Sequence, residues 1–190
     1  KKEDETDIHN LNRKALGMSH ITRDDAKTFI YAFLLGAGTG KVAQILRVNQ
    51  REAGQAVENF MESIQGLASL KKKIVPHIAK RGWFKGLDGR KVVVPSEHKT
   101  LAGMLQNGES VIMKHSALQW VRQAKAEGID FKLVTWPHDE WQTEVCGTMA
   151  TAEALGKLQR QSIVDTGVKF DMMCPLAGST DIGRNWKDTH

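Results

Sequence analysis

The sequence predicts an α+β fold, and three observations carry this prediction. Helical spacing of apolar residues dominates the first half of the chain, strand-like runs bounded by turn residues appear later, and further helical runs are mixed with them. With 190 residues, 41% of them hydrophobic and 26% charged, the chain can bury a real core. We therefore divide it into a helix-rich part, residues 1–82, and a strand-containing part, residues 83–190.

The most clearly marked helix begins at Thr22. Thr22 and Asp25 form a capping box of the S/T-x-x-acid kind, in which each side chain can bond the other residue's backbone N–H. The helix should run to Leu34 or Leu35, because the glycine-rich stretch GAGTG follows directly.

The other elements are predicted from spacing and turn residues. Residues 1–21 are polar and predict a short helix or loop, KVAQIL predicts a second helix, and residues 50–70 predict a third. The later predictions are a hairpin turn at Asp88-Gly89, a helix over 99–127, two strands joined at His138-Asp139-Glu140, a last helix over 148–165 and a short strand near Met172.

Composition and cysteine usage exclude several classes of protein. No apolar run approaches the length of a membrane span, and no signal peptide opens the chain, which starts at Lys1 and is treated as a cut end. The 27 basic and 22 acidic residues give a net charge of +5, compatible with a phosphate-bearing partner without requiring one. Cys146 and Cys174 have no CxxC spacing and are predicted to be free thiols.

One face of the helix after Thr22 is a candidate anion site. Arg23, Lys27 and Tyr31 are spaced i, i+4 and i+8, so they project from the same side. A triphosphate between the two cations would relieve their repulsion and would suit the positive end of the helix. The alternative is a solvated basic edge balanced by neighbouring acids, and spacing alone favours that alternative.

The glycine-rich stretch GAGTGKV resembles a phosphate-binding loop only superficially. Its glycines are one residue too close together, and Val42 stands where the motif needs serine or threonine. The stretch also follows a predicted helix instead of a strand. We therefore predict a turn between two helices.

The two acids in TWPHDEWQT are the candidate metal ligands. Asp139 and Glu140 stand at the corner of a predicted hairpin, where rigid strands could present carboxylate oxygens to a hard cation. The alternative is an ordinary polar turn, with His138 as a structural hydrogen-bonding group. His9, in the stretch DIHN, is equally open between the two interpretations. The five tryptophans are predicted to pack in or near the core.

Six stretches together resemble the C-terminal polymerase region of family A DNA polymerases, nearest to the phage replicative type. They are DIHN, TRDDAKTFIYAFLLGAG, WFKGLDGRKVVV, HKTLAGMLQNGES, WPHDEWQTEV and GRNW, in the family's order over nearly the whole chain. The resemblance implies a helical fingers subdomain and part of an antiparallel-sheet palm. It also implies DNA-directed DNA polymerase activity on deoxynucleoside triphosphates and a DNA primer–template.

On the nucleotide side, the resemblance assigns four residues. Arg23 and Lys27 would bind the triphosphate of the incoming nucleotide, with His9 reaching the phosphates from the preceding segment. Tyr31 would lie near the sugar and base. The family usually carries a tyrosine at the position of Leu35, so nucleotide selection is expected to differ here.

On the palm side, the resemblance implies a two-metal magnesium site. Asp139 would be a catalytic metal ligand with Glu140 close by, and His138 would lie near the primer end. Gln106 would touch the minor groove of the primer–template, although a neighbouring contact is weakened because Ala102 replaces the family's usual asparagine.

The palm motif that carries the family's other catalytic aspartate is not found before DIHN. We therefore expect one half of a split or truncated polymerase, inactive without an upstream N-terminal polypeptide. A processivity factor is a further candidate partner, and the expected location is the cytoplasm, that of the host if the chain is phage-encoded.

Two other interpretations stay open. The chain could be a non-catalytic nucleic-acid-binding or assembly module that keeps a polymerase fold, which Leu35 and the missing motif would suit. It could also be part of a single-subunit RNA polymerase, which shares the palm and the basic fingers helix. Retention of Arg23, Lys27 and Asp139 together argues against a pure scaffold.

Overall fold

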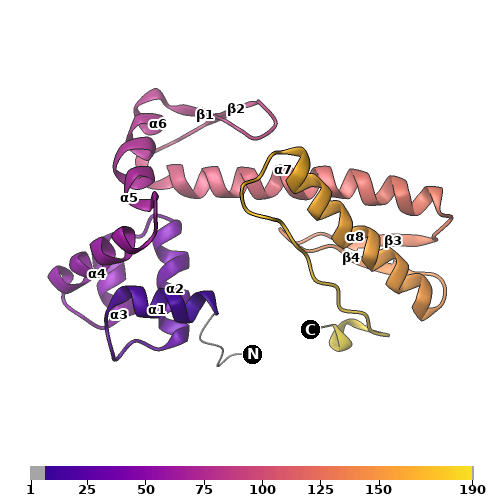
Figure 1. The fold of residues 1–190 in the computed structure, drawn as a ribbon, viewed down its shortest axis with the longest axis horizontal. Helices are drawn as coiled ribbons and strands as arrows, with labels where there is room; N and C mark the ends of the chain where they lie inside the picture. Colours follow the sequence, from indigo (N-terminus) through magenta and orange to yellow (C-terminus); the bar gives the residue numbers. More distant parts are fainter. Residues whose placement is uncertain (1–6, 190) are drawn as a thin grey trace. The chain divides into compact units, whose positions relative to one another are not determined.

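The computed structural model describes residues 7–189 and confirms the predicted α+β class (Figure 1). The elements are α1 (Ile8–Leu16), α2 (Arg23–Leu34), α3 (Thr39–Leu46), α4 (Gln50–Ser63), α5 (Leu67–Ser69), a π-helical turn (Leu70–Ile74), α6 (Val75–Arg81), β1 (Trp83–Lys85), β2 (Lys91–Val93), α7 (Glu97–Ala126), β3 (Phe131–Thr135), β4 (Gln142–Val145), α8 (Met149–Lys169) and a 3₁₀ turn (Trp186–Asp188). Two compact units divide after Leu105, so α7 contributes to both. The division at residues 82 and 83 stays a prediction.

The first unit is built on a hydrophobic core shared by α1–α4, which includes three phenylalanines of α2 and α4. Phe29, Phe33 and Phe60 are buried, and their ring centroids lie 5.2 to 5.9 Å apart in edge-to-face and stacked arrangements. Rings at these separations attract one another beyond the area they bury. The core fixes one face of α2 and leaves the opposite face to solvent.

Both ends of α2 are defined as the sequence predicts. The Thr22 hydroxyl accepts a hydrogen bond from the Asp25 backbone N–H at 3.1 Å, and the Asp25 carboxylate accepts one from the Thr22 N–H at 2.9 Å. Gly36 then ends the helix at a φ of 86°, and a Cβ there would lie 2.0 Å from the carbonyl oxygen of His98. Only glycine fits this approach, so the glycine-rich stretch is a turn and no phosphate-binding loop.

The predicted third helix is shorter than expected. It ends at Ser63, because Ile64 is extended and Gly66 takes a positive φ of 82°. The short helix α5 and the π-helical turn then follow. In that turn Lys71 is half-buried over the ring of Phe33, with its Nζ atom 4.9 Å from the centroid. Burial lowers the pKa of Lys71. Helical spacing continued through this region, so the sequence pattern did not reveal the break.

The hairpin β1–β2 forms at the predicted Asp88-Gly89 turn and pairs antiparallel. Its side chains alternate, as a half-buried ribbon requires. Phe84 is buried with Ile78 and Val94, while the residues on either side of Phe84 face outward.

The second unit contains most of α7, the hairpin β3–β4 and α8 around a fully buried Trp120. A buried hydrogen bond of 2.9 Å from the Ser116 hydroxyl to Thr166 joins α7 to α8. The predicted last helix extends further than expected, to Lys169. Cys146 and Cys174 are free and exposed, as predicted.

The predicted strand near Met172 is wrong for the described residues. Asp171 turns the chain at a φ of 51°, and the segment after it lies against α8. Leu176 packs closely on Gly167, and the Thr180 hydroxyl donates a hydrogen bond of 3.3 Å to the Gly156 carbonyl. The C-terminal tail therefore packs in an irregular conformation against the small residues Gly156 and Gly167 of α8.

Candidate active site

The exposed face of α2 carries the predicted nucleotide-binding side chains. Lys27 and Tyr31 are exposed, with Tyr31 at 55%, while Ala26, Phe29 and Phe33 are buried on the other face. The helix therefore presents Lys27 and Tyr31 to solvent on a backbone held by the core. Arg23 starts the same face at the first turn of the helix.

Arg23 is already engaged by a carboxylate that the sequence did not reveal as its partner. Its Nε and Nη2 atoms donate to the two oxygens of Asp7 at 2.9 and 3.0 Å. Such a two-point contact is the stronger kind of guanidinium–carboxylate pair. The guanidinium of Arg23 holds the pKa of Asp7 below its usual range. Any phosphate that binds Arg23 must share this group with Asp7.

His9 is tied to the same place through the first turn of α1. Asp7 caps that helix and accepts hydrogen bonds from the backbone N–H groups of His9 and Asn10 at 3.1 and 3.2 Å. The Nδ1 atom of His9 is buried and has no hydrogen-bond partner among the described residues. The Asp7 carboxylate thus accepts hydrogen bonds from both the His9 backbone and the Arg23 guanidinium.

The hairpin turn after β3 presents the predicted palm residues. His138 adopts a positive φ of 49°, an uncommon conformation for a residue other than glycine. Its carbonyl accepts a hydrogen bond from Trp136 Nε1 at 3.1 Å, and the Glu140 N–H donates to the Pro137 carbonyl at 3.0 Å. The pairing between the strands also shifts between Leu133 and Thr135. Bulges of this kind redirect side chains at a strand end.

Aromatic contacts hold this hairpin against α7. The ring of Trp120 lies 5.1 Å from Phe131 and 5.7 Å from Trp141, and Trp136 lies 6.0 Å from Trp141 between centroids. These three tryptophans are therefore packing groups, as predicted, whereas Trp186 is 58% exposed and the prediction is wrong there. They place the turn beside the first part of α7 in this unit.

A hollow of about 660 Å³ joins three of the predicted residues. Gln106 contributes from α7, and His138 and Asp139 contribute from the turn. The full lining is Gln106, Glu109, Ser110, Met113, Lys114, Trp136, His138 and Asp139. Glu140 does not line it, and its carboxylate accepts a hydrogen bond from Gln142 Nε2 at 2.6 Å.

The residues on α7 that complete this hollow were not singled out from sequence. Ser110, Met113 and Lys114 follow Gln106 at intervals of three and four, so they share its face of the helix. That spacing was the signal that could have identified them. Asp7, the partner of Arg23, carried no such signal because its contact spans 16 positions in the chain.

The described residues show no metal site. Among them, no three His, Cys, Asp or Glu side chains gather as possible ligands. Asp139 and Glu140 nevertheless offer the hard oxygens that Mg²⁺ prefers, and both are exposed. Because Mg²⁺ commonly takes one or two carboxylates together with waters and substrate phosphates, this pair fits such an ion.

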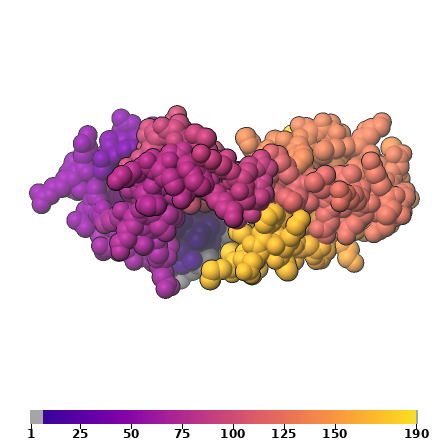
Figure 2. All heavy atoms as spheres, turned by 90° about the horizontal axis from the view of Figure 1, so that it is seen from above, coloured from indigo at the N-terminus to yellow at the C-terminus, as the bar shows by residue number. Residues whose placement is uncertain are grey.

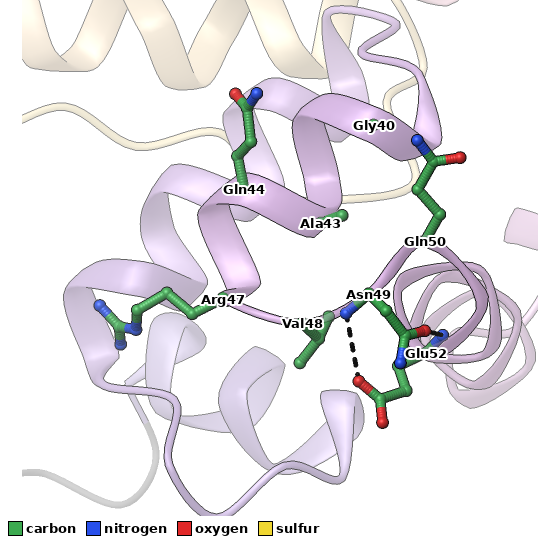
Figure 3. Close-up of a pocket in the computed structure, with 8 residues that line it drawn as sticks. All are labelled: Gly40, Ala43, Gln44, Arg47, Val48, Asn49, Gln50 and Glu52. Carbon is green, nitrogen blue, oxygen red and sulfur yellow. Dashed lines mark hydrogen bonds between the residues drawn. The ribbon is translucent and has the colours of Figure 1, made fainter.

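A second hollow, of about 640 Å³, lies at the turn between α3 and α4 (Figure 3). Asn49 and Glu52 close a capping box there, with bonds of 3.2 and 2.9 Å. Arg47 extends away from the other lining side chains and pairs with Asp25 at 2.6 Å. None of the predicted site residues lines this hollow, and its polar groups serve the helix ends.

Comparison with known proteins identifies the family to which this chain belongs. The family model described as DNA polymerase family A matches residues 2–188. The chain belongs to the family A DNA polymerases. The DNA-directed DNA polymerase of Enterobacteria phage T3 is 32% identical over 97% of this chain, and that of Escherichia phage T7 is 31% identical over 97%. The predicted resemblance to the phage type is therefore confirmed.

This family A chain spans 29% of the length of each of those two phage relatives. DNA polymerase I of Bacillus subtilis is also similar, at 21% identity over 96% of the chain and 22% of the relative. A solved structure, the POL domain of Pol1 from M. smegmatis in complex with DNA primer-template and dNTP, has a TM-score of 0.72. The two sequences are 19% identical, and the match covers 83% of this chain and 30% of the solved chain. The similarity confirms the fold.

The helices of this family A chain also bear on the membrane prediction. No helix in the described part of the chain combines the length and the apolar character that crossing a bilayer needs. The individual roles assigned to the site residues stay predictions.

Proposed function

We propose that this chain supplies the nucleotide-binding helix and part of the metal-binding turn of a DNA-directed DNA polymerase. The observation that carries the proposal is the shared hollow of Gln106, His138 and Asp139. A residue from a long helix and two from a tight turn, far apart along the chain, meet there. In a chain of this family such a meeting suits a primer end held beside a carboxylate.

The proposed reaction is nucleotidyl transfer. The primer's 3′-oxygen forms a bond to the α-phosphorus of the nucleotide, the bond to the bridging oxygen breaks, and pyrophosphate leaves with its electron pair. The hydroxyl proton is lost to solvent or a nearby base. Asp139, with Glu140, would hold Mg²⁺, which when bound activates the hydroxyl and neutralises charge on the phosphates.

The α2 face would bind the triphosphate. Lys27 is exposed and Arg23 lies one turn earlier, at the positive end of the helix. Arg23 would exchange part of its contact with Asp7 for phosphate oxygens, which also carry negative charge. Tyr31, one turn beyond Lys27, would face the sugar and base.

Gln106 and His138 would position the primer terminus in the second unit. Both are exposed and line the hollow with Asp139, so they can reach a bound strand without first breaking a buried contact. The amide of Gln106 can both donate to and accept from minor-groove atoms. Ser110 is a further polar group on the same face.

We also propose that primer extension needs a polypeptide segment carrying a further palm carboxylate. Two adjacent acids on one turn are a small ligand set for a reaction that uses two ions. The isolated chain should therefore bind nucleotide without extending a primer. Adding the upstream part of a family A DNA polymerase should restore extension.

Nucleotide binding tests the α2 assignment. Lys27→Ala should weaken dATP binding about tenfold or more in titration calorimetry, because it removes a charged hydrogen bond. The matched control is Lys125→Ala, another exposed lysine on a helix. Equal affinity of the parent and the Lys27→Ala chain would remove the basis for this assignment.

Primer extension tests the rest. With the upstream part supplied, Asp139→Asn should abolish extension while leaving nucleotide binding in place. Extension by the isolated parent chain would show that the proposed second segment is unnecessary. Nucleotide binding without any extension by the reconstituted pair would favour the non-catalytic module. Extension with ribonucleotides in preference to deoxynucleotides would favour an RNA polymerase.

A further inference from the structure

The positive charge of this protein is concentrated in one segment. Residues 71–91 contain eight lysines and arginines and one acid, a net charge of +7, whereas the whole chain carries +5. The remainder of the chain is therefore slightly acidic. The segment runs from the π-helical turn through α6 to β2, and its surface faces the viewer in Figure 2, in magenta.

The first lysines of this segment have roles inside the fold. Lys72 pairs with Glu58 at 2.5 Å, and Lys71 lies over Phe33. The later cations are different. We define the basic hairpin surface as Lys80, Arg81, Lys85 and Lys91, together with Trp83. None of its four cations makes a salt bridge within the described residues.

The hairpin register sets two of these cations against each other. Lys85 stands directly opposite Lys91, and Trp83 opposite Val93, so all four project from the same side. Like charges directly opposite on neighbouring strands destabilise a hairpin. Val93 is also 73% exposed on this side. An anion between the lysines would remove the repulsion.

The indole of Trp83 completes the surface. The guanidinium carbon of Arg81 lies 4.2 Å from its ring centroid and the Lys91 Nζ atom 5.1 Å, while Arg81 Nε donates to the Trp83 carbonyl at 2.9 Å. Cations interleaved with an aromatic ring suit a strand that offers phosphates and flat bases in alternation. An acidic peptide would use the charges but has no regular planar group for the ring and the guanidinium.

We infer that the basic hairpin surface binds the sugar–phosphate backbone of single-stranded DNA, without preference for base sequence. The inference rests on the proposed function only for the choice of DNA as the nucleic acid. The contact is additional to the α2 face and to the hollow at Gln106. Its role would be to hold unpaired DNA, with the negative phosphates bound between the side chains of Lys85 and Lys91.

Salt dependence of binding tests this inference. The affinity of the 190-residue chain for fluorescein-labelled oligothymidylate would be measured by anisotropy over a series of salt concentrations. Replacing both opposed lysines, Lys85→Gln with Lys91→Gln, should make the slope of log affinity against log salt shallower by about 1.4, or about 0.7 for each phosphate that is no longer neutralised. The same variant should melt at the parent temperature or above, because it removes the repulsion.

Three comparisons make the result decisive. Lys125→Gln with Lys157→Gln removes the same charge from exposed positions elsewhere and should leave the slope unchanged. Lys85→Arg with Lys91→Arg keeps the charge and should keep the parent slope. Tighter binding of polyglutamate than of oligothymidylate at matched charge concentration would instead assign the surface to an acidic protein and overturn the inference.

The outcome is separate from that of the proposed function. An unchanged slope in the double glutamine variant overturns the DNA contact even if Lys27→Ala loses nucleotide. A shallower slope supports the contact even if no nucleotide binds at Lys27.

Discussion

The α2 face and the β3–β4 turn present their site residues from very different supports. Helix α2 packs its own Phe29 and Phe33 against Phe60 of α4, is capped at Thr22 and is tied through Arg23 to Asp7 at the start of α1. The hairpin leaves β3 largely exposed, with Val134 at 65%, and is fixed mainly through rings that meet Trp120. The backbone of α2 is fixed by packing, capping and an ion pair within the first unit. The β3–β4 turn is held mainly by the ring contacts of one face of the hairpin with Trp120.

This difference fits the two tasks proposed for them. A triphosphate meets a helix whose cations are already placed, so little conformational entropy has to be lost on binding. A metal-binding turn with exposed strands can gain further order when other groups complete it. Substitutions in each support test whether the helix face and the turn are independent of one another.

The largest effect is expected from removing the ring that anchors the hairpin. Trp120→Ala should lower the free energy of unfolding of the second unit by about 3–5 kcal/mol, because a fully buried indole is lost. Amide hydrogen exchange should rise across β3 and β4 and stay unchanged across α2. Urea denaturation with exchange measured on both units checks this.

Phe29→Ala is the matched variant in the other unit. It should produce the opposite pattern, with faster exchange across α2 and unchanged exchange in β3 and β4. Faster exchange in both hairpin and helix from either substitution would show that the two supports are coupled, and the comparison would fail.

The next effect concerns the end of α2. Gly36→Ala should cost about 2–4 kcal/mol, because the residue has a positive φ and its Cβ would meet the His98 carbonyl at 2.0 Å. Gly103→Ala, inside helix α7 with nothing near its Cβ, should instead stabilise the chain by about 0.5–1 kcal/mol. Thermal unfolding of the two variants checks the contrast. A stable Gly36→Ala chain would mean that α2 does not end under constraint.

Local sequence patterns predicted the elements whose signals are local. The capping box at Thr22, the turn at Asp88-Gly89 and the corner at His138 all involve residues within a few positions of one another. The break after Ser63 was missed because helical spacing continues through it. The strand near Met172 was wrong because a strand requires a partner, and the tail instead packs on glycines of α8.

The candidate site divides in the same way. Arg23, Lys27 and Tyr31 could be placed on one face from spacing, since a helix fixes which side chains are neighbours. The Asp7 contact to Arg23 and the meeting of Gln106 with Asp139 depend on tertiary packing. For that meeting, only the family resemblance pointed to the residues, and no sequence spacing pointed to their proximity.

Smaller effects are expected at the helix caps of the two units. Thr22→Ala and Thr148→Ala each remove the hydroxyl that accepts a backbone N–H, at 3.1 and 3.3 Å. Each should lower the free energy of unfolding by about 1 kcal/mol. Only Thr22→Ala should also weaken dATP binding, because it loosens the first turn that carries Arg23. Equal effects of both on dATP binding would indicate a general loss of stability instead.

The smallest effect at neutral pH, and the most specific, is expected from Asp7→Asn. Asparagine still caps α1, so this substitution removes the charge pair with Arg23 and little else. Because Arg23 lowers the pKa of Asp7 in the folded chain, the pair stabilises the fold above the ordinary carboxyl pKa of 3.8. That stabilisation is lost as the pH falls through the lowered value.

The free-energy difference between parent and variant, from urea titrations, should therefore shrink on acidification. Asp24→Asn, at a carboxylate 92% exposed and 3.7 Å from Arg23, should show no such convergence. Freed from Asp7, Arg23 should also bind dATP more tightly, and an unchanged affinity would mean that Asp7 does not compete with phosphate.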